Sequence, residues 1–323
     1  MDPIKKKTAV ILYGYMRTFK DTAPHLIKNI LMVNNADLFI FCYENEGASN
    51  IINMENVNNE KNKNAVKWDS EGGLITESLL RSIYEDFLVE FSINKYNRNF
   101  FMEESKNIFS PVLPIERFYS LYWNMSNSVK MLNRYCEKNN IEYESVLITR
   151  PDLIFYDIVD LSVCDRKKIS VPTHGGNFLF GEKPKPYFAC YYKNVERGEL
   201  IPWNTVVFSD QFIYSSFDNI IKLLTLYENL SFYNKIGVPV CHPETVLYYH
   251  LSLSNKIPVN TIDIVYEILR STTVKVSNEL LLAFPPQKDS LDIHSNTKQV
   301  NLPVRSLFIR YLKRVAKTIL NQN

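Results

Sequence analysis

The chain has 323 residues, of which 46% are hydrophobic, so it can bury a large core and a wholly disordered chain is excluded. Its 37 Lys and Arg residues nearly balance its 35 Asp and Glu residues, and the net charge of +2 argues against a nucleic-acid-binding protein. The five cysteines are scattered without a CxxC pair. No run of about 18 apolar residues is present, and no apolar leader precedes the first strand, which predicts a cytoplasmic protein.

The N-terminal part of the chain alternates strand and helix patterns. Residues 8–13 form a short apolar run that predicts a buried strand, and Gly14 permits a tight turn after it. A helical pattern follows over residues 22–32, and a second apolar strand over residues 36–42. This order predicts two parallel strands joined by a right-handed crossover.

A polar segment then interrupts the pattern. Residues 44–70 are rich in Asn, Glu and Lys and predict a surface insertion. Helical periodicity returns over residues 77–87 and 115–138 and leads into an apolar strand that ends at residues 150–152. The pattern predicts an α/β fold with a mostly parallel central sheet flanked by helices.

The second half of the chain is less regular. The expected elements are a short strand, a loop rich in Gly, Pro and aromatic residues, a strand broken by polar residues, and two helices. They occupy residues 169–172, 174–202, 204–214, 217–229 and 243–254, respectively. We expect one domain over residues 1–255, followed by a C-terminal extension over residues 256–323.

The extension carries a basic amphipathic helix over residues 304–320. Its apolar residues recur at three- and four-residue spacing, and its basic residues lie mainly off that stripe. The apolar set is Phe308, Tyr311, Leu312, Val315, Ile319 and Leu320, and the basic set is Arg310, Lys313, Arg314 and Lys317. Such a helix can lie on an anionic membrane surface, or it can pack on the domain with a solvated polar face.

Charged residues follow two of the expected strands at their carboxyl ends, where ligands bind in open α/β sheets. Arg150 and Asp152 follow one strand, and Arg17 follows the first strand after Tyr13 and Gly14. Because a guanidinium group can form paired hydrogen bonds with phosphate oxygens, these residues predict a site for a phosphorylated ligand. The alternatives are an Arg–Asp pair that only completes the strand end, and an Arg17 side chain on a helix surface.

Five segments carry a family resemblance through their order and spacing. They are Tyr13-Gly-Tyr-Met-Arg17-Thr-Phe, Ala36-Asp-Leu-Phe-Ile-Phe, Leu147-Ile-Thr-Arg150-Pro-Asp152-Leu, Ser209-Asp210-Gln211-Phe and His242-Pro-Glu244. Together they resemble the GT-A-type glycosyltransferases of bacterial lipopolysaccharide and capsule synthesis, including the WavE-like group. The resemblance spans roughly residues 8–255 and implies a GT-A-like (Rossmann-like) fold. It also implies transfer of a sugar from a nucleotide-diphosphate sugar donor to a surface glycan or lipid-linked acceptor.

In GT-A enzymes an Asp-x-Asp motif at a strand end holds Mn²⁺ or Mg²⁺ on the donor diphosphate. Here the corresponding position has Arg150 in place of the first acid, so metal dependence is left open. Either a hard cation or a fixed guanidinium group can stabilise the negative charge of a departing diphosphate. Asp152 can hold a metal ion through one carboxylate or orient a hydroxyl of the donor sugar.

Polar residues in the second half of the chain are the remaining candidates. Asp210 is expected to act as the catalytic base, with a helix N-cap as its alternative, and Gln211 to contact a sugar hydroxyl. Glu244 is a second candidate acid in the acceptor site, and His174 lies in a segment that can cover the acceptor. His242 is a candidate metal or phosphate ligand, with a capping role as the alternative.

Other function classes lack their motifs. GxGxxG, GxxxxGK[ST] and GxSxG are all absent from the chain, which disfavours dinucleotide-dependent oxidoreductases, P-loop NTPases and α/β-hydrolases. Two alternatives stay open, namely a sugar nucleotidyltransferase and a catalytically silent glycan-binding protein of the same fold. The expected location is the cytoplasm, peripheral on the inner face of a membrane that the helix 304–320 contacts.

Overall fold

The computed structural model describes residues 4–47, 72–108, 110, 114–175, 186–194 and 197–269. Most of the expected insertion at residues 44–70 and all of the expected helix at residues 304–320 lie outside these ranges. Within them, no helix has both the length and the apolar character needed to cross a membrane.

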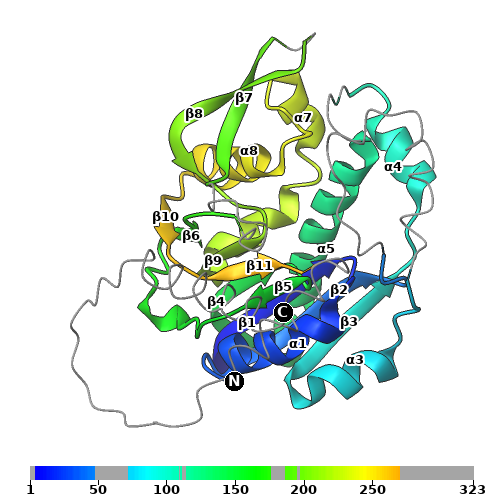
Figure 1. Cartoon of the computed structure of the whole chain (residues 1–323), viewed down its shortest axis with the longest axis vertical. Helices are drawn as coiled ribbons and strands as arrows, with labels where there is room; N and C mark the ends of the chain where they lie inside the picture. The colour runs from blue at the N-terminus through cyan, green and yellow to red at the C-terminus, as the bar shows by residue number, and fades with distance from the viewer. Residues whose placement is uncertain are drawn as a thin grey trace, which may run out of the picture. The chain divides into compact units, whose positions relative to one another are not determined.

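The described elements alternate along the chain as an α/β pattern (Figure 1). The strands are β1 (Ile4–Gly14), β2 (Ala36–Tyr43), β3 (Leu88–Asn94), β4 (Ile141–Thr149), β5 (Leu153–Phe155), β6 (Ile169–Pro172), β7 (Phe188–Asn194), β8 (Glu199–Val207), β9 (Phe212–Ser216), β10 (Val259–Ile262) and β11 (Tyr266–Ile268). The α-helices are α1 (Phe19–Leu26), α3 (Glu77–Tyr84), α4 (Arg98–Ser105), α5 (Ile115–Asn139), α6 (Phe217–Ile220), α7 (Leu230–Lys235) and α8 (Pro243–Tyr248). Short π-helical segments extend α1 (Ile27–Leu31) and α8 (Tyr249–Ser254), and 3-10 turns occur at Glu85–Phe87, Leu161–Val163 and Ile221–Thr225.

Among the described residues, seven strands form the central sheet in the order β10-β6-β9-β4-β1-β2-β3. Strands β3, β2, β1 and β4 are mutually parallel, and β9 runs antiparallel to both β4 and β6. Strand β10 pairs in parallel with β6. The expected α/β class with a mostly parallel sheet flanked by helices is confirmed, and this arrangement is compatible with a Rossmann-like fold.

The central strand β1 is buried on both of its faces. Its residues Ala9, Val10, Ile11 and Leu12 are fully buried, and successive side chains of a strand point to opposite faces. Ala9 and Ile11 therefore join the core under the long helix α5, whereas Val10 and Leu12 join the core under α1. A continuous apolar run is the sequence pattern expected of such a doubly covered parallel strand.

The topology sets the position of the site. From β1 the chain proceeds to β2 on one side of the sheet, and it later returns to place β4 on the other side of β1. The strand order therefore reverses between β1 and β4, and a crevice for ligands forms outside the carboxyl ends of strands at such a point. These ends are Gly14 in β1 and Thr149 in β4.

Three expectations for the second half of the chain are corrected. The expected loop at residues 174–202 contains β7 and the start of β8, which form an antiparallel hairpin separate from the central sheet. The strand expected at residues 204–214 is divided, because its first part belongs to β8 and its last part to β9. Two strands beyond residue 255, β10 and β11, pair with β6 and β5, so folded structure continues past the expected end of the domain.

A buried asparagine ties the loop after β5 to the end of α1. The Asn34 side chain donates from Nδ2 to the carbonyl oxygens of Ile30 and Val159, each at 2.8 Å. Its Oδ1 accepts from the Leu161 backbone N–H, also at 2.8 Å. Every polar atom of this side chain is thus paired inside the protein.

We expect Asn34→Ala to lower the free energy of unfolding by about 2–3 kcal/mol, because it leaves a buried carbonyl and a buried N–H without partners. The matched change Asn139→Ala removes an exposed asparagine at the end of α5 and is expected to cost less than about 0.5 kcal/mol. Urea unfolding followed by circular dichroism measures both values. Equal effects of the two changes would contradict this account.

Candidate functional site

The turn after β1 places Arg17 at the carboxyl end of the strand. Gly14 and Arg17 both have left-handed backbone conformations, with φ of 88° and 48°. This conformation costs little at glycine but is uncommon for an arginine, and such strain tends to be kept at functional positions. The Arg17 backbone N–H donates to the Glu46 carbonyl oxygen at 2.7 Å, which holds the turn.

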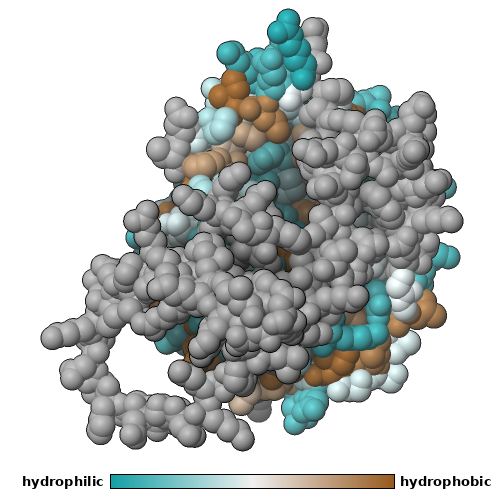
Figure 2. All heavy atoms as spheres, viewed as in Figure 1, coloured by the Kyte–Doolittle hydropathy of each residue, from teal (hydrophilic) through white to brown (hydrophobic). Residues whose placement is uncertain are grey.

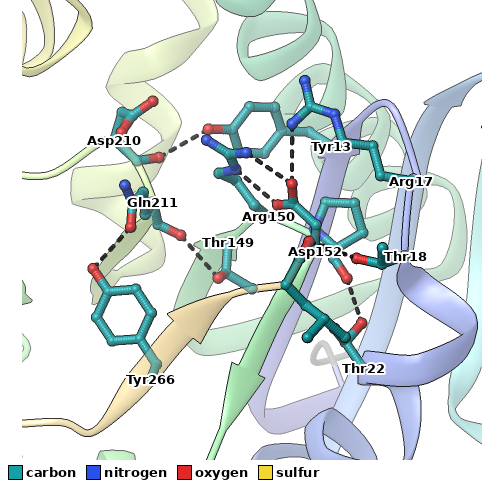
Figure 3. Close-up of polar contacts among 12 residues, drawn as sticks. Tyr13, Arg17, Thr18, Thr22, Thr149, Arg150, Asp152, Asp210, Gln211 and Tyr266 are labelled. Atoms are coloured by element: carbon teal, nitrogen blue, oxygen red, sulfur yellow. Dashed lines mark hydrogen bonds and ion pairs between the residues drawn. The ribbon is translucent and has the colours of Figure 1, made fainter. Parts of the chain in front are cut away.

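A buried carboxylate joins the tips of β1 and β4 (Figure 3). Arg150 binds Asp152 through two parallel hydrogen bonds, from Nε to Oδ1 at 2.9 Å and from Nη2 to Oδ2 at 2.8 Å. Arg17 donates from Nη1 to the same Oδ2 at 3.0 Å. The Asp152 side chain is 1% exposed, whereas the side chains of Arg17 and Arg150 are 29% and 17% exposed. One buried carboxylate is therefore paired with two partly exposed guanidinium groups.

The backbone around Asp152 is held from three sides. The Thr22 hydroxyl donates to the Pro151 carbonyl at 2.5 Å, and the Leu269 N–H donates to the Asp152 carbonyl at 2.8 Å. Leu269 is in turn fixed by the Thr18 hydroxyl, which donates to its carbonyl oxygen at 3.0 Å. Helix α1, its N-cap residue Thr18 and the segment after β11 together fix the tip of β4.

A divalent cation does not fit on Asp152 in this arrangement. Both carboxylate oxygens accept hydrogen bonds from guanidinium groups. Two unit charges about 4 Å apart repel by about 4 kcal/mol at an effective dielectric constant near 20, and a divalent ion beside Arg150 would double that value. Among the residues that the structure describes, no group of three or more His, Cys, Asp or Glu side chains is arranged to hold a metal ion.

Asp210 and Gln211 lie beside the arginine pair, in the turn between β8 and β9. The Tyr13 hydroxyl donates to the Asp210 carbonyl at 2.9 Å, and the Thr149 hydroxyl donates to the Gln211 carbonyl at 2.9 Å (Figure 3). The next element after Asp210 is strand β9, which begins at Phe212, so the alternative in which Asp210 caps a helix is wrong. The tips of β1 and β4 thus hold this turn by two hydroxyl groups.

Asp210 is buried, and the carboxyl group of Glu244, whose side chain is 13% exposed, lies near it. Burial, and then the nearby Glu244 carboxyl group, raise the pKa of Asp210 from 3.8 to about 7. Burial likewise raises the pKa of Glu244 from 4.5 to about 7, and Arg150 partly opposes the shift in both groups. Near neutral pH these two acids can therefore accept and release protons, which is what acid–base catalysis requires.

The two candidate histidines lie at the margin of the site. Burial lowers the pKa of His242 to about 4, so its ring is neutral at pH 7. Its Nδ1 lies 3.0 Å from the Thr245 hydroxyl and 3.3 Å from a Glu244 oxygen. The carbonyl oxygen of His174 lies 3.2 Å from the Tyr266 hydroxyl, and its Nε2 lies 3.6 Å from an oxygen of the exposed Asp263.

Tyr266 is a site residue that the sequence did not indicate. Its hydroxyl donates to Oε1 of Gln211 at 3.0 Å, and its pKa is raised chiefly by burial. The side-chain oxygen of Gln211 is therefore engaged within the protein, and Gln211 is 3% exposed. No signal in the sequence could have identified Tyr266, since it lies beyond the expected domain and follows no motif.

Comparisons with known proteins add no further constraint on the site. No family model matches the sequence, and a search of curated proteins finds no significant match.

The acid pair should make the stability depend on pH. Because both carboxyl groups have raised pKa values, the folded state keeps protons between about pH 4 and pH 7 that the unfolded chain has lost. The free energy of unfolding should therefore fall as the pH rises through this window, by up to about 1.4 kcal/mol per pH unit for each group.

We expect Asp210→Asn to reduce this slope, and Asp157→Asn, at an exposed position, to leave it unchanged. Denaturant unfolding measured at pH 4, 5, 6 and 7 provides the comparison. An identical pH dependence in the wild type and Asp210→Asn would show that Asp210 is not the titrating group.

Proposed function

We propose that this protein is a glycosyltransferase that moves a sugar from a nucleotide-diphosphate sugar to a surface glycan or lipid-linked acceptor, as in lipopolysaccharide or capsule synthesis. One observation carries the proposal. Arg17 and Arg150 are held on Asp152 at the strand reversal, beside the acid pair Asp210 and Glu244. Positive charge for a leaving diphosphate and a group that accepts a proton near pH 7 thus lie at one edge of the sheet.

In the proposed reaction an acceptor hydroxyl oxygen forms a bond to the anomeric carbon of the donor sugar. Asp210 takes the proton of that hydroxyl, and the bond from the anomeric carbon to the diphosphate oxygen breaks. The electron pair of that bond leaves with the diphosphate, where Arg17 and Arg150 stabilise the added negative charge. Atoms and charge balance without a further reactant.

Asp210 is assigned as the base, and Glu244 to the acceptor side. Asp210 is 6% exposed, and its backbone carbonyl accepts a hydrogen bond from the Tyr13 hydroxyl. The Glu244 side chain is 13% exposed and lies next to His242 at the start of α8. A carboxyl group with some contact to solvent is better placed to meet an incoming acceptor.

The hairpin β7–β8 supports a glycan as the acceptor. The aromatic rings of Tyr191, Trp203 and Tyr248 follow one another with centroids 5.8 and 5.7 Å apart. Tyr248 lies one turn after Glu244 in α8, and residues four apart share a helix face. Aromatic rings suit the apolar faces of sugars, and the surface over the hairpin, at the top of Figure 2, carries both hydrophobic and hydrophilic residues.

The hairpin is anchored to the helix that carries Glu244. The Cys190 backbone N–H donates to the Thr245 hydroxyl at 2.7 Å, and Phe208 N–H donates to the Tyr187 carbonyl at 2.9 Å. A glycan on these rings would therefore lie at a fixed distance from the acid pair.

The basic amphipathic pattern of residues 304–320 supports a further part of the proposal, namely a peripheral position on the inner face of a membrane.

We expect Asp210→Asn to lower kcat about 10²-fold or more, because the amide cannot accept the acceptor's proton, and to change nucleotide-diphosphate affinity less than about 3-fold. A panel of UDP- and GDP-sugars with a lipopolysaccharide core oligosaccharide as acceptor provides the assay, and Asp157→Asn is the matched control. Full activity in Asp210→Asn would remove this residue from the mechanism. If neither the wild type nor Asp157→Asn turns over any nucleotide sugar, the catalytically silent glycan-binding alternative is favoured.

Replacing Trp203 by Ala should weaken acceptor binding selectively. Loss of one aromatic contact of about 1 kcal/mol is expected to raise KM for the acceptor about 5-fold, with KM for the donor unchanged. Phe232→Ala removes an exposed aromatic ring on α7 and serves as the control. A KM for the acceptor that is the same in Trp203→Ala and the wild type would exclude the hairpin from the acceptor site.

A further inference from the structure

We propose that the donor diphosphate binds without a divalent cation, on Arg17 and Arg150 acting as a fixed pair of positive charges, with Asp152 as the residue that positions both. This inference rests on the proposed glycosyl transfer and specifies how its donor is recognised. It replaces the role that an Asp-x-Asp motif would give to a metal ion.

The three side chains differ in exposure, and this difference decides which charges an incoming ligand meets first. Asp152 is 1% exposed, whereas Arg17 and Arg150 are 29% and 17% exposed. A ligand that reaches the strand tips therefore meets guanidinium groups first, and the carboxylate lies behind them. The two arginines and one aspartate together carry a net charge of +1, which favours an anion over a cation.

Arg150 has an N–H group outside its two hydrogen bonds to Asp152, and this group can donate to a second anion. Its hydrogen bonds to Asp152 use Nε and Nη2, so Nη1 is not part of the fork. Figure 3 shows the guanidinium group between Asp152 and the Tyr13–Asp210 side of the site. The planar group is oriented before a ligand arrives, and pre-oriented charged donors are what phosphate recognition uses.

Arg17 is also held at this place, although it comes from the turn after β1. Its backbone is fixed in the left-handed region by the hydrogen bond to Glu46, and its Nη1 is fixed by Asp152. The two guanidinium groups share one carboxylate oxygen, Oδ2, so they lie close together at the reversal point. Two adjacent positive charges match the two adjacent phosphates of a diphosphate.

Two roles of Asp152 can be told apart by experiment: it positions the guanidinium groups, or it acts only as a nearby negative charge. If Asp152 acted only as a nearby negative charge, Asp152→Asn would tighten diphosphate binding, because it removes repulsion. If Asp152 positions the guanidinium groups, the same change weakens binding, because the fork is lost. The sign of the change in affinity therefore decides between the two roles.

The test is titration calorimetry of the full chain with UDP, GDP and inorganic pyrophosphate, in EDTA and again with Mn²⁺. We expect at least one of these ligands to bind in EDTA, with an affinity within about 3-fold of that in Mn²⁺. Arg17→Gln and Arg150→Gln should each weaken that binding about 10-fold or more, as expected for loss of a charge-assisted hydrogen bond. Arg81→Gln, at an exposed position on α3, is the control and should bind like the wild type.

Asp152→Asn is expected to weaken binding in EDTA, and tighter binding in this variant would overturn the positioning role. Thermal unfolding of every variant verifies that it folds, and the partly exposed Arg17→Gln carries the test if a change at Arg150 or Asp152 prevents folding. Nucleotide binding that requires Mn²⁺ would overturn the inference and leave the proposed glycosyl transfer standing. Binding of none of the three ligands in either condition would overturn both.

Discussion

A single buried carboxylate organises the edge of the sheet on which the site lies. Asp152 binds Arg150 from its own strand end and Arg17 from the end of β1, and without it two guanidinium groups would face each other at the strand tips. Breaking a buried ion pair on one side is costly because it leaves charge uncompensated. The segment 150–152 is accordingly fixed by hydrogen bonds from Thr22 and Leu269 as well.

Arg150 binds Asp152 together with Arg17, and its charge also acts on the acid pair Asp210 and Glu244. Its positive charge acts against the rise in the pKa of Asp210 and Glu244 that burial causes. In the proposed reaction, negative charge that grows on a departing diphosphate offsets Arg150 and thereby makes Asp210 a stronger base. Leaving-group stabilisation and proton transfer would then support each other during the same step.

The second half of the chain completes the site from outside the parallel strands. The turn between β8 and β9 supplies Asp210 and Gln211, α8 supplies Glu244, and the segment around β11 supplies Tyr266. These parts meet because β9 enters the sheet next to β4 in the antiparallel direction, which brings its amino end to the carboxyl end of β4. A fully parallel neighbour would have placed Asp210 at the opposite edge.

The chain's amino-acid sequence by itself determined the buried strands β1, β2 and β4, the long helix α5, and the presence of Arg17, Arg150 and Asp152 at strand ends. It could do so because continuous apolar runs and helical periodicity are local patterns that burial imposes. Strand β7 and the start of β8 were expected as a loop, since Pro202 and the glycines before it weaken the local strand pattern. Only the tertiary structure decided that Asp152 binds two arginines, that Asp210 and Glu244 lie near each other, and that Tyr266 reaches Gln211. Those outcomes depend on which distant segments meet and on how much water they exclude, and neither quantity is encoded in the spacing of residues along the chain.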